Sequence, residues 1–239
     1  MPETVPPEVV VDSPEHLAET LAWRLEEDAS QAIAARGRFS LALPGGSVAS
    51  AFFPRLARAG VDWARTDFFW VDERAVPPED PESNYGAAER LWLTPAGVPP
   101  ARVHRMAAAA TDLEAAAAAY EYEMIRVLGR PPRLDVALLG MGPDGHVCSL
   151  FPGHPLLLEE RRLVAAVHDS PKPPARRLTL TLPALASAGR VVVAAPGEAK
   201  AAPAREALRD PASTLPVAVV LRSARRVLLL LDHGAARLL

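Results

Sequence analysis

The chain has 239 residues, of which 49% are hydrophobic and 23% charged, a balance typical of a globular protein with a sizeable core. Its formal net charge of -3 gives no electrostatic reason to expect a nucleic-acid partner, and its one cysteine, Cys148, excludes an intrachain disulfide. Because the apolar runs are too short to span a bilayer and residues 1–17 lack the basic start of a signal peptide, we expect a soluble, cytoplasmic protein that binds no membrane.

Short apolar runs alternate with helical segments along the chain. Strands are predicted at 8–11, 39–43, 67–71, 134–140, 163–167, 190–195 and 226–231. Helices are predicted at 14–37 behind the capping residue Ser13, after the turn at 44–47, at 85–92, from the capping box at 111–114 to about 129, at 197–209 and at 233–239. Residues 72–84 and 171–174 are predicted to be loops.

This alternation predicts the fold class. No Asn-Gly or Asp-Gly hairpin joins two strands, so we expect a single α/β domain over 1–239, with a mainly parallel, Rossmann-like sheet and helices on both faces. Ligands of such sheets bind beyond the carboxyl ends of the strands. The loops at 44–47, 72–84 and 140–153 all follow strands and are therefore expected to share one rim.

The turn Gly45-Gly46-Ser47 lies between a predicted strand and a predicted helix. It has two interpretations, a tight connection that needs glycine backbone angles and a phosphate cradle made of amides at a helix N-terminus. A nucleophile elbow is not favoured, since Ala49 stands where that motif requires its last glycine. A Walker loop is not favoured either, because Gly-Lys-Ser/Thr is missing.

The segment GMGPDGH at 140–146 follows the most apolar strand. Gly140, Gly142 and Gly145 have the spacing of a dinucleotide fingerprint, but Pro143, Asp144 and His146 occupy a turn that should hold small apolar residues. We interpret the glycines as letting the backbone approach a ligand while presenting Asp144 and His146. A histidine at a strand exit, two residues from an aspartate, is a candidate general base.

A metal site is the alternative for the same segment. Asp144, His146, Cys148 and His154 are all residue types that bind metals, but their spacing matches no standard zinc pattern. We therefore expect no metal.

Charged residues also follow other predicted strands. Asp72-Glu73-Arg74 closes one strand, and arginine suits phosphate groups and developing oxyanions. Arg176 and Arg177 precede an alternating stretch typical of an edge strand, and for Arg176 we favour plain surface charge. Lys200 begins a helix, where a cation is disfavoured by the helix dipole, and only it and Lys172 are lysines among 26 basic residues. Lys200 is thus a candidate for contacting an anion.

Four segments together resemble the 6-phosphogluconolactonase family, within the glucosamine-6-phosphate isomerase/deaminase-like superfamily. They are LPGGSVAS, FFWVDERAVPPEDPESNYG, LDVALLGMGPDGHVCSLFPG and PKPPARRLTLTLPAL. Val48-Ala49 stand where the family usually has Thr-Pro, and Asp80 stands where it often has His. The related deaminases carry Asp-Glu-Tyr and a later Asn-Glu-Pro, but here Arg74 and Ser149-Leu150-Phe151-Pro152 occupy those places. The missing acid favours hydrolysis over isomerisation.

The resemblance implies hydrolysis of 6-phospho-D-glucono-1,5-lactone to 6-phospho-D-gluconate in the oxidative pentose phosphate pathway, without a cofactor. It implies that the substrate phosphate is bound at 45–47 near Gly142, with Arg177 and Lys200 neutralising its charge. His146 would activate water, Arg74 would stabilise the oxyanion, and Asp72 or Asp144 would orient the base.

Two other functions are weighed. One is an aldose-phosphate isomerase or deaminase of the glucosamine-6-phosphate type. The other is a non-catalytic sugar-phosphate sensor, which is not favoured because the first predicted strand leaves no room ahead of it for a DNA-binding helix-turn-helix. As partners we expect a phosphosugar lactone, no nucleic acid and no membrane, for a monomer or weak homo-oligomer.

Overall fold

The computed structural model describes residues 6–239, so residues 1–5, on which the signal-peptide prediction partly rests, lie outside the described residues. A parallel sheet of six strands has the order β1-β9-β8-β5-β2-β3. Its strands are β1 (Glu8–Val11), β2 (Phe39–Leu43), β3 (Thr66–Trp70), β5 (Val136–Gly140), β8 (Arg190–Ala195) and β9 (Val227–Leu231). The mainly parallel α/β fold predicted from the sequence is confirmed.

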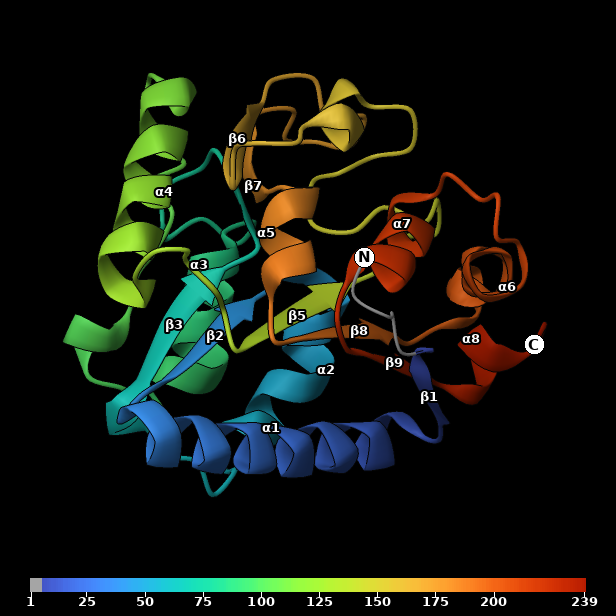
Figure 1. The fold of residues 1–239 in the computed structure, drawn as a ribbon, viewed down its shortest axis with the longest axis horizontal. Helices are drawn as coiled ribbons and strands as arrows, with labels where there is room; N and C mark the ends of the chain where they lie inside the picture. The colour runs from blue at the N-terminus through green and yellow to red at the C-terminus, as the bar shows by residue number, and fades with distance from the viewer. Residues whose placement is uncertain (1–5) are drawn as a thin grey trace.

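Helices cover both faces of this sheet. The α-helices of the described chain are α1 (Pro14–Arg36), α2 (Gly46–Leu56), α3 (Asn84–Ala88), α4 (Leu113–Leu128), α5 (Leu182–Ser187), α6 (Ala201–Arg209), α7 (Pro216–Ser223) and α8 (His233–Ala236). In Figure 1, α1 and α2 lie below the six-stranded sheet, and α5 and α7 lie above it. The sequence analysis missed α5 and α7, both short helices that begin with a proline near the first turn.

Three further strands form a second, antiparallel sheet that the sequence analysis did not predict. It has the order β4-β7-β6, with β4 (Asp72–Arg74), β7 (Arg177–Leu180) and β6 (Val164–Val167). The prediction of a loop over 72–84 is therefore wrong at its start, and β7 is the middle strand rather than an edge. The connection from β6 to β7 is a long one through Pro171, Pro173 and Pro174, which carries no tight-hairpin signature.

The strand order places a ligand crevice between β2 and β5. From β2 the chain continues outward to β3, whereas from β5 it continues the other way to β8 and β9. Loops leaving two adjacent parallel strands in opposite directions open a crevice at their carboxyl ends. The turn after β2 and the segment after β5 lie at this point, as the sequence analysis predicted for the shared rim.

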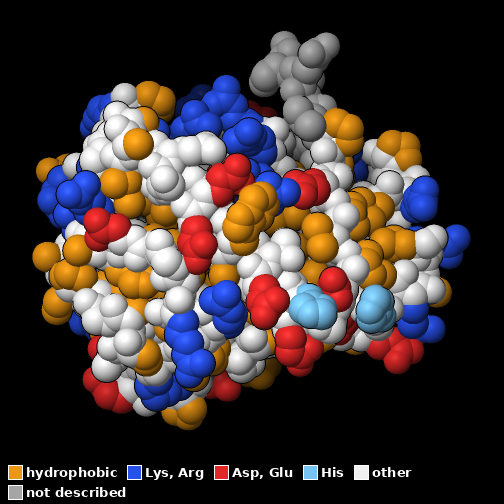
Figure 2. Space-filling model, turned by 90° about the horizontal axis from the view of Figure 1, so that it is seen from below, with side chains coloured by type: hydrophobic (Ala, Val, Ile, Leu, Met, Phe, Trp, Pro, Cys, Tyr) orange, Lys and Arg blue, Asp and Glu red, His pale blue; other side chains and the backbone are white. Residues whose placement is uncertain are grey.

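Both sheets contribute to one hydrophobic core, which includes Leu41 of β2, Leu139 of β5, Ala165 of β6 and Leu178 of β7. On the face seen from below in Figure 2, acidic and basic side chains are interspersed with apolar ones, a pattern typical of a solvated surface. No helix within residues 6–239 is long and apolar enough to cross a membrane.

Candidate active site

A cavity of about 280 Å³ opens at the carboxyl ends of β2 and β5. Nearly all the candidate residues named from the sequence line it. These are Gly45, Gly46, Ser47, Asp72, Arg74, Gly142, His146, Arg177 and Lys200. Asp144 completes the set through its contact with His146. The predicted rim is therefore a real pocket, and its polar groups come from both sheets.

The glycine-rich turn presents the start of α2 to this pocket. Gly45 is the N-cap residue, and Gly46 has a φ of 61°, a conformation that favours glycine. No side chain caps the helix, so its first amides are left for a ligand or water. A Cβ at Gly45 would lie 1.7 Å from Oδ1 of Asn84. The turn therefore needs glycine, as the first interpretation predicted, and its uncapped amides face the pocket, which is compatible with the second.

His146 forms a pair with Asp144. Nδ1 of His146 lies 2.5 Å from Oδ1 of Asp144, so a proton shared there leaves Nε2 as the basic nitrogen. The ring packs against Phe151, with centroids 4.8 Å apart. Gly142 makes room for the pair, since a Cβ there would lie 2.0 Å from Nδ1 of His146. The turn at 142–146 thus fixes one tautomer of an imidazole that faces the pocket.

The surroundings of this pair set its protonation. Burial lowers the pKa of His146 below its usual 6.5, and Lys172 lowers it further, while Asp144 opposes the shift. Burial alone would raise the pKa of Asp144, but the hydrogen bond from His146 and the charge of Lys172 outweigh it and hold that pKa below 3.8. Near neutral pH the site therefore holds a neutral imidazole beside a carboxylate, which is the arrangement of a general base.

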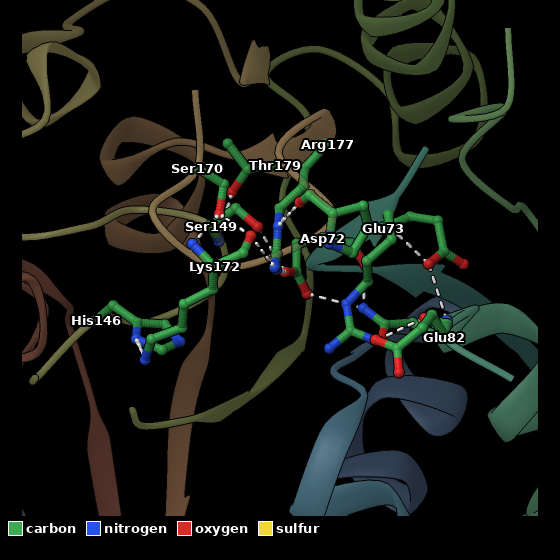
Figure 3. Close-up of polar contacts among 12 residues, drawn as sticks. Asp72, Glu73, Glu82, His146, Ser149, Ser170, Lys172, Arg177 and Thr179 are labelled. Carbon is green, nitrogen blue, oxygen red and sulfur yellow. Dashed lines mark hydrogen bonds and ion pairs between the residues drawn. The ribbon is translucent and has the colours of Figure 1, made fainter. Parts of the chain in front are cut away.

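Asp72 is engaged elsewhere. Its carboxylate accepts hydrogen bonds from Ser149 Oγ at 2.8 Å and Asn84 Nδ2 at 3.1 Å, and it lies 4.0 Å from Nη1 of Arg177. Figure 3 shows Asp72 beside Arg177, away from the imidazole of His146. Of the two aspartates that the sequence left open as partners of the histidine, the geometry therefore pairs His146 with Asp144.

The two predicted arginines are held in fixed positions. Arg177 is 5% exposed and donates to the backbone oxygens of Lys172, Pro173 and Pro174. Arg74 lines the pocket and donates through Nη1 to the backbone oxygen of Glu82. Hydrogen bonds restrict both guanidinium groups, and burial further restricts that of Arg177, so both present charge to the pocket with little conformational freedom.

Glu73 holds the backbone of Arg74 and Asn84 through hydrogen bonds to its carboxylate. Its buried carboxylate accepts hydrogen bonds from the backbone N–H groups of Arg74, Asn84 and Tyr85 and from Ser83 Oγ. Burial raises its pKa above the usual 4.5 despite these donors. Glu73 therefore ties β4 to the start of α3 and has no free lone pair for a ligand.

Lys200 and Lys172 are the two lysines of the pocket lining. No ion pair of Lys200 occurs among the described residues, and burial lowers its pKa below 10.5, with Lys172 adding to the effect. A partly buried cation without an acidic partner fits an anionic ligand group. The sequence analysis gave no role to Lys172 or to Asn84, although the scarcity of lysine was a signal for Lys172.

The same segment was also weighed as a metal site. No three His, Cys, Asp or Glu side chains within residues 6–239 are arranged to hold a metal ion. His154 instead contacts Asp169, and Cys148 is buried, with burial raising its thiol pKa well above the usual value. Cys148 also has a φ of 52°, the one positive φ of a non-glycine residue in the described chain.

The fold and the pocket define a class of protein. A glycine turn at a helix N-terminus, four cationic side chains and a neutral imidazole paired with a carboxylate meet in one crevice of a parallel α/β sheet. Anion binding and general base catalysis are the chemistry that such a site supports. This is the arrangement of an enzyme that acts on a small, negatively charged substrate.

The chain belongs to the family of glucosamine-6-phosphate isomerases and 6-phosphogluconolactonases, whose family model matches residues 12–229. It is 42% identical to a 6-phosphogluconolactonase of Streptomyces coelicolor, over 96% of this chain and 94% of that one. It is 41% identical to a 6-phosphogluconolactonase of Rattus norvegicus, over 96% of this chain and 92% of that one.

Solved structures agree with this assignment. The 6-phosphogluconolactonase of Trypanosoma brucei superposes with a TM-score of 0.85 at 28% identity, covering 97% of this chain and 98% of that one. A monomeric glucosamine-6-phosphate deaminase reaches a TM-score of 0.83 at 22% identity, covering 97% of this chain and all of that one (100%), so it shares the fold. Since the fold is common to both activities, the residues of the site must distinguish them.

Proposed function

We propose that this protein is a 6-phosphogluconolactonase, which hydrolyses 6-phospho-D-glucono-1,5-lactone to 6-phospho-D-gluconate in the oxidative pentose phosphate pathway. The observation that carries the proposal is the pairing of His146 with Asp144 at 2.5 Å in a pocket that also holds the glycine turn. Relatives above 40% identity over most of the chain bear the same name.

The phosphate is bound where the pocket has the uncapped amides of α2 and Lys200, a cation without an ion pair among the described residues. The backbone N–H groups of Gly46 and Ser47 at the start of α2, which no side chain caps, donate hydrogen bonds to the phosphate oxygens. Lys200 supplies a positive charge from the pocket lining, and Arg177 adds a fixed charge beside Asp72. Gly142 leaves room for the His146 and Asp144 side chains beside the pocket.

The reaction then requires one proton transfer in each direction. Nε2 of His146 removes a proton from water as its oxygen attacks the C1 carbonyl, and Arg74 stabilises the oxyanion. Asp144 holds Nδ1–H and stabilises the imidazolium. The tetrahedral intermediate collapses by breaking the bond from C1 to the ring oxygen, which takes the proton back from His146. Ester hydrolysis of this kind uses protein groups alone, so we propose that no cofactor takes part.

A deaminase is the second candidate, and the site disfavours it. Ring opening and isomerisation of an amino sugar phosphate need a further acid near the base. Ser149 follows the histidine segment here, and its hydroxyl donates to Asp72. Asp144 is the carboxylate hydrogen-bonded to His146 in the described chain.

A coupled assay tests the proposed function. Glucose-6-phosphate dehydrogenase generates the lactone in place, and 6-phosphogluconate dehydrogenase reports the product as NADPH. The quantity is the rate above spontaneous hydrolysis of the lactone, and we expect a large excess. No excess, together with ammonia release from glucosamine 6-phosphate, would establish the deaminase instead. A ligand-induced rise in melting temperature without turnover of either compound would indicate a sensor.

Further properties belong to the same proposal. We propose a single domain over 1–239, supported by the core that both sheets share. We also propose a cytoplasmic location and a monomer or weak homo-oligomer without a nucleic-acid partner, supported by the net charge of -3 and the mixed-charge face in Figure 2. Sedimentation velocity over a hundredfold concentration range tests the state of assembly.

A further inference from the structure

Lys172 contacts the His–Asp pair from the other sheet. It lies in the connection between β6 and β7, and its Nζ is 3.3 Å from Oδ1 of Asp144 and 3.2 Å from Nδ1 of His146. In Figure 3 its side chain extends from the segment near Ser170 to the imidazole of His146. Oδ1 of Asp144 therefore accepts hydrogen bonds from both the imidazole of His146 and the ammonium group of Lys172.

The backbone of Lys172 is anchored. Ser170 Oγ accepts a hydrogen bond from the N–H of Lys172 and donates one to its carbonyl oxygen, and Arg177 Nη2 also donates to that oxygen. These contacts fix the base of the side chain in the pocket wall. By contrast Arg176, four positions further on, donates to the backbone oxygen of Thr111 and lies outside the pocket lining.

We propose that Lys172 is a positioning residue for the reaction: its ammonium group holds the Asp144 carboxylate against Nδ1 of His146 and so keeps Nε2 free to accept the proton of water. This inference rests on the proposed lactonase function. It assigns Lys172 to the base rather than to the substrate phosphate, because Lys200 is the cation of the pocket lining that has no ion pair among the described residues.

The charges around the imidazole decide whether removing Lys172 raises or lowers the pKa of His146. Asp144 and Asp72 favour the imidazolium, whereas Lys172 and burial disfavour it. Lys172 therefore opposes protonation of the resting base. A unit charge 3.2 Å away in a water-like dielectric shifts a pKa by about one unit. Removing Lys172 should raise the pKa of His146 by about that amount and loosen Asp144.

Two variants test the inference, with Arg176→Met as the control for loss of a nearby cation. Lys172→Met removes one hydrogen bond to a charged group. We therefore expect kcat to fall roughly tenfold, with little change in KM. The acid limb of kcat/KM should move about one unit to higher pH. Lys172→Arg should restore most of kcat and return the limb to its wild-type position, and Arg176→Met should leave both unchanged.

A second readout does not depend on turnover. NMR titration of the histidine side chains in the full chain, with the His146 signal assigned from His146→Ala, should show a higher pKa in Lys172→Met than in wild type. A raised KM with an unshifted limb, or an unchanged His146 titration, would overturn the inference and assign Lys172 to substrate binding. An inactive wild type would overturn the proposed function instead, so the two failures are distinguishable.

Discussion

Gly142→Ala should inactivate the site without unfolding the protein. A Cβ at this position would lie 2.0 Å from Nδ1 of His146 and 2.5 Å from Oδ1 of Asp144, whereas real Cβ contacts are essentially never under 3.0 Å. The imidazole must therefore move by about 1 Å, the difference between 3.0 and 2.0 Å. A displacement of about 1 Å in a reacting group costs on the order of a hundredfold in rate.

The measurement is kcat in the coupled lactonase assay, beside the melting temperature of each variant. Gly60→Ala is the matched control, since its added Cβ would come no closer than 3.4 Å, to Oε1 of Glu26, and neither residue lines the pocket. We expect Gly142→Ala to lose about a hundredfold in kcat and to melt close to wild type, with Gly60→Ala unaffected. A folded Gly142→Ala enzyme that keeps more than half of the wild-type kcat would refute the steric argument.

Three further predictions concern the charges of the site. Asp144→Asn weakens a hydrogen bond to a charged group, a loss that should lower kcat/KM by roughly 10- to 150-fold. A loss under threefold in steady-state kinetics would contradict the role of Asp144 as the partner of His146. Lys200→Met should raise KM for the lactone more than it lowers kcat and weaken inhibition by inorganic phosphate; an unchanged KM would remove Lys200 from the phosphate site. Burial and Lys172 lower the pKa of His146 below 6.5, so the imidazole stays neutral until the pH falls below that value. The acid limb of kcat/KM should therefore have its midpoint below pH 6.5. A midpoint above pH 6.5 would contradict the assignment of His146 as the base.

The six-stranded sheet could be predicted because most of its strands are short apolar runs that can be recognised from the local sequence. A run such as residues 39–43 is apolar except for Ser40 and ends at a glycine turn, so both its class and its position follow from the sequence. The second sheet could not be predicted in this way. β4 has three residues, two of them acidic, and its pairing with β7 joins segments about a hundred residues apart. Such a strand is set by long-range contacts rather than by its own pattern.

In the site, too, local motifs were predictable from the sequence and residues placed by long-range contacts were not. Gly45 and His146 were predictable because each stands in a short motif directly after a strand. Lys172 and Asn84 reach the pocket from the connection between β6 and β7 and from the start of α3, and no local pattern gives the direction of their side chains. The choice between Asp72 and Asp144 likewise needed distances, since both follow strands at the same rim.

The most direct test of the account is the coupled lactonase assay on wild type and on His146→Ala, at pH 7 and with the spontaneous rate subtracted. His168→Ala is the matched control, because His168 is exposed and pairs with Glu114 outside the pocket. The account predicts a large excess rate for wild type and for His168→Ala, and a rate near background for a folded His146→Ala. A folded His146→Ala protein that hydrolyses the lactone as fast as wild type would contradict it.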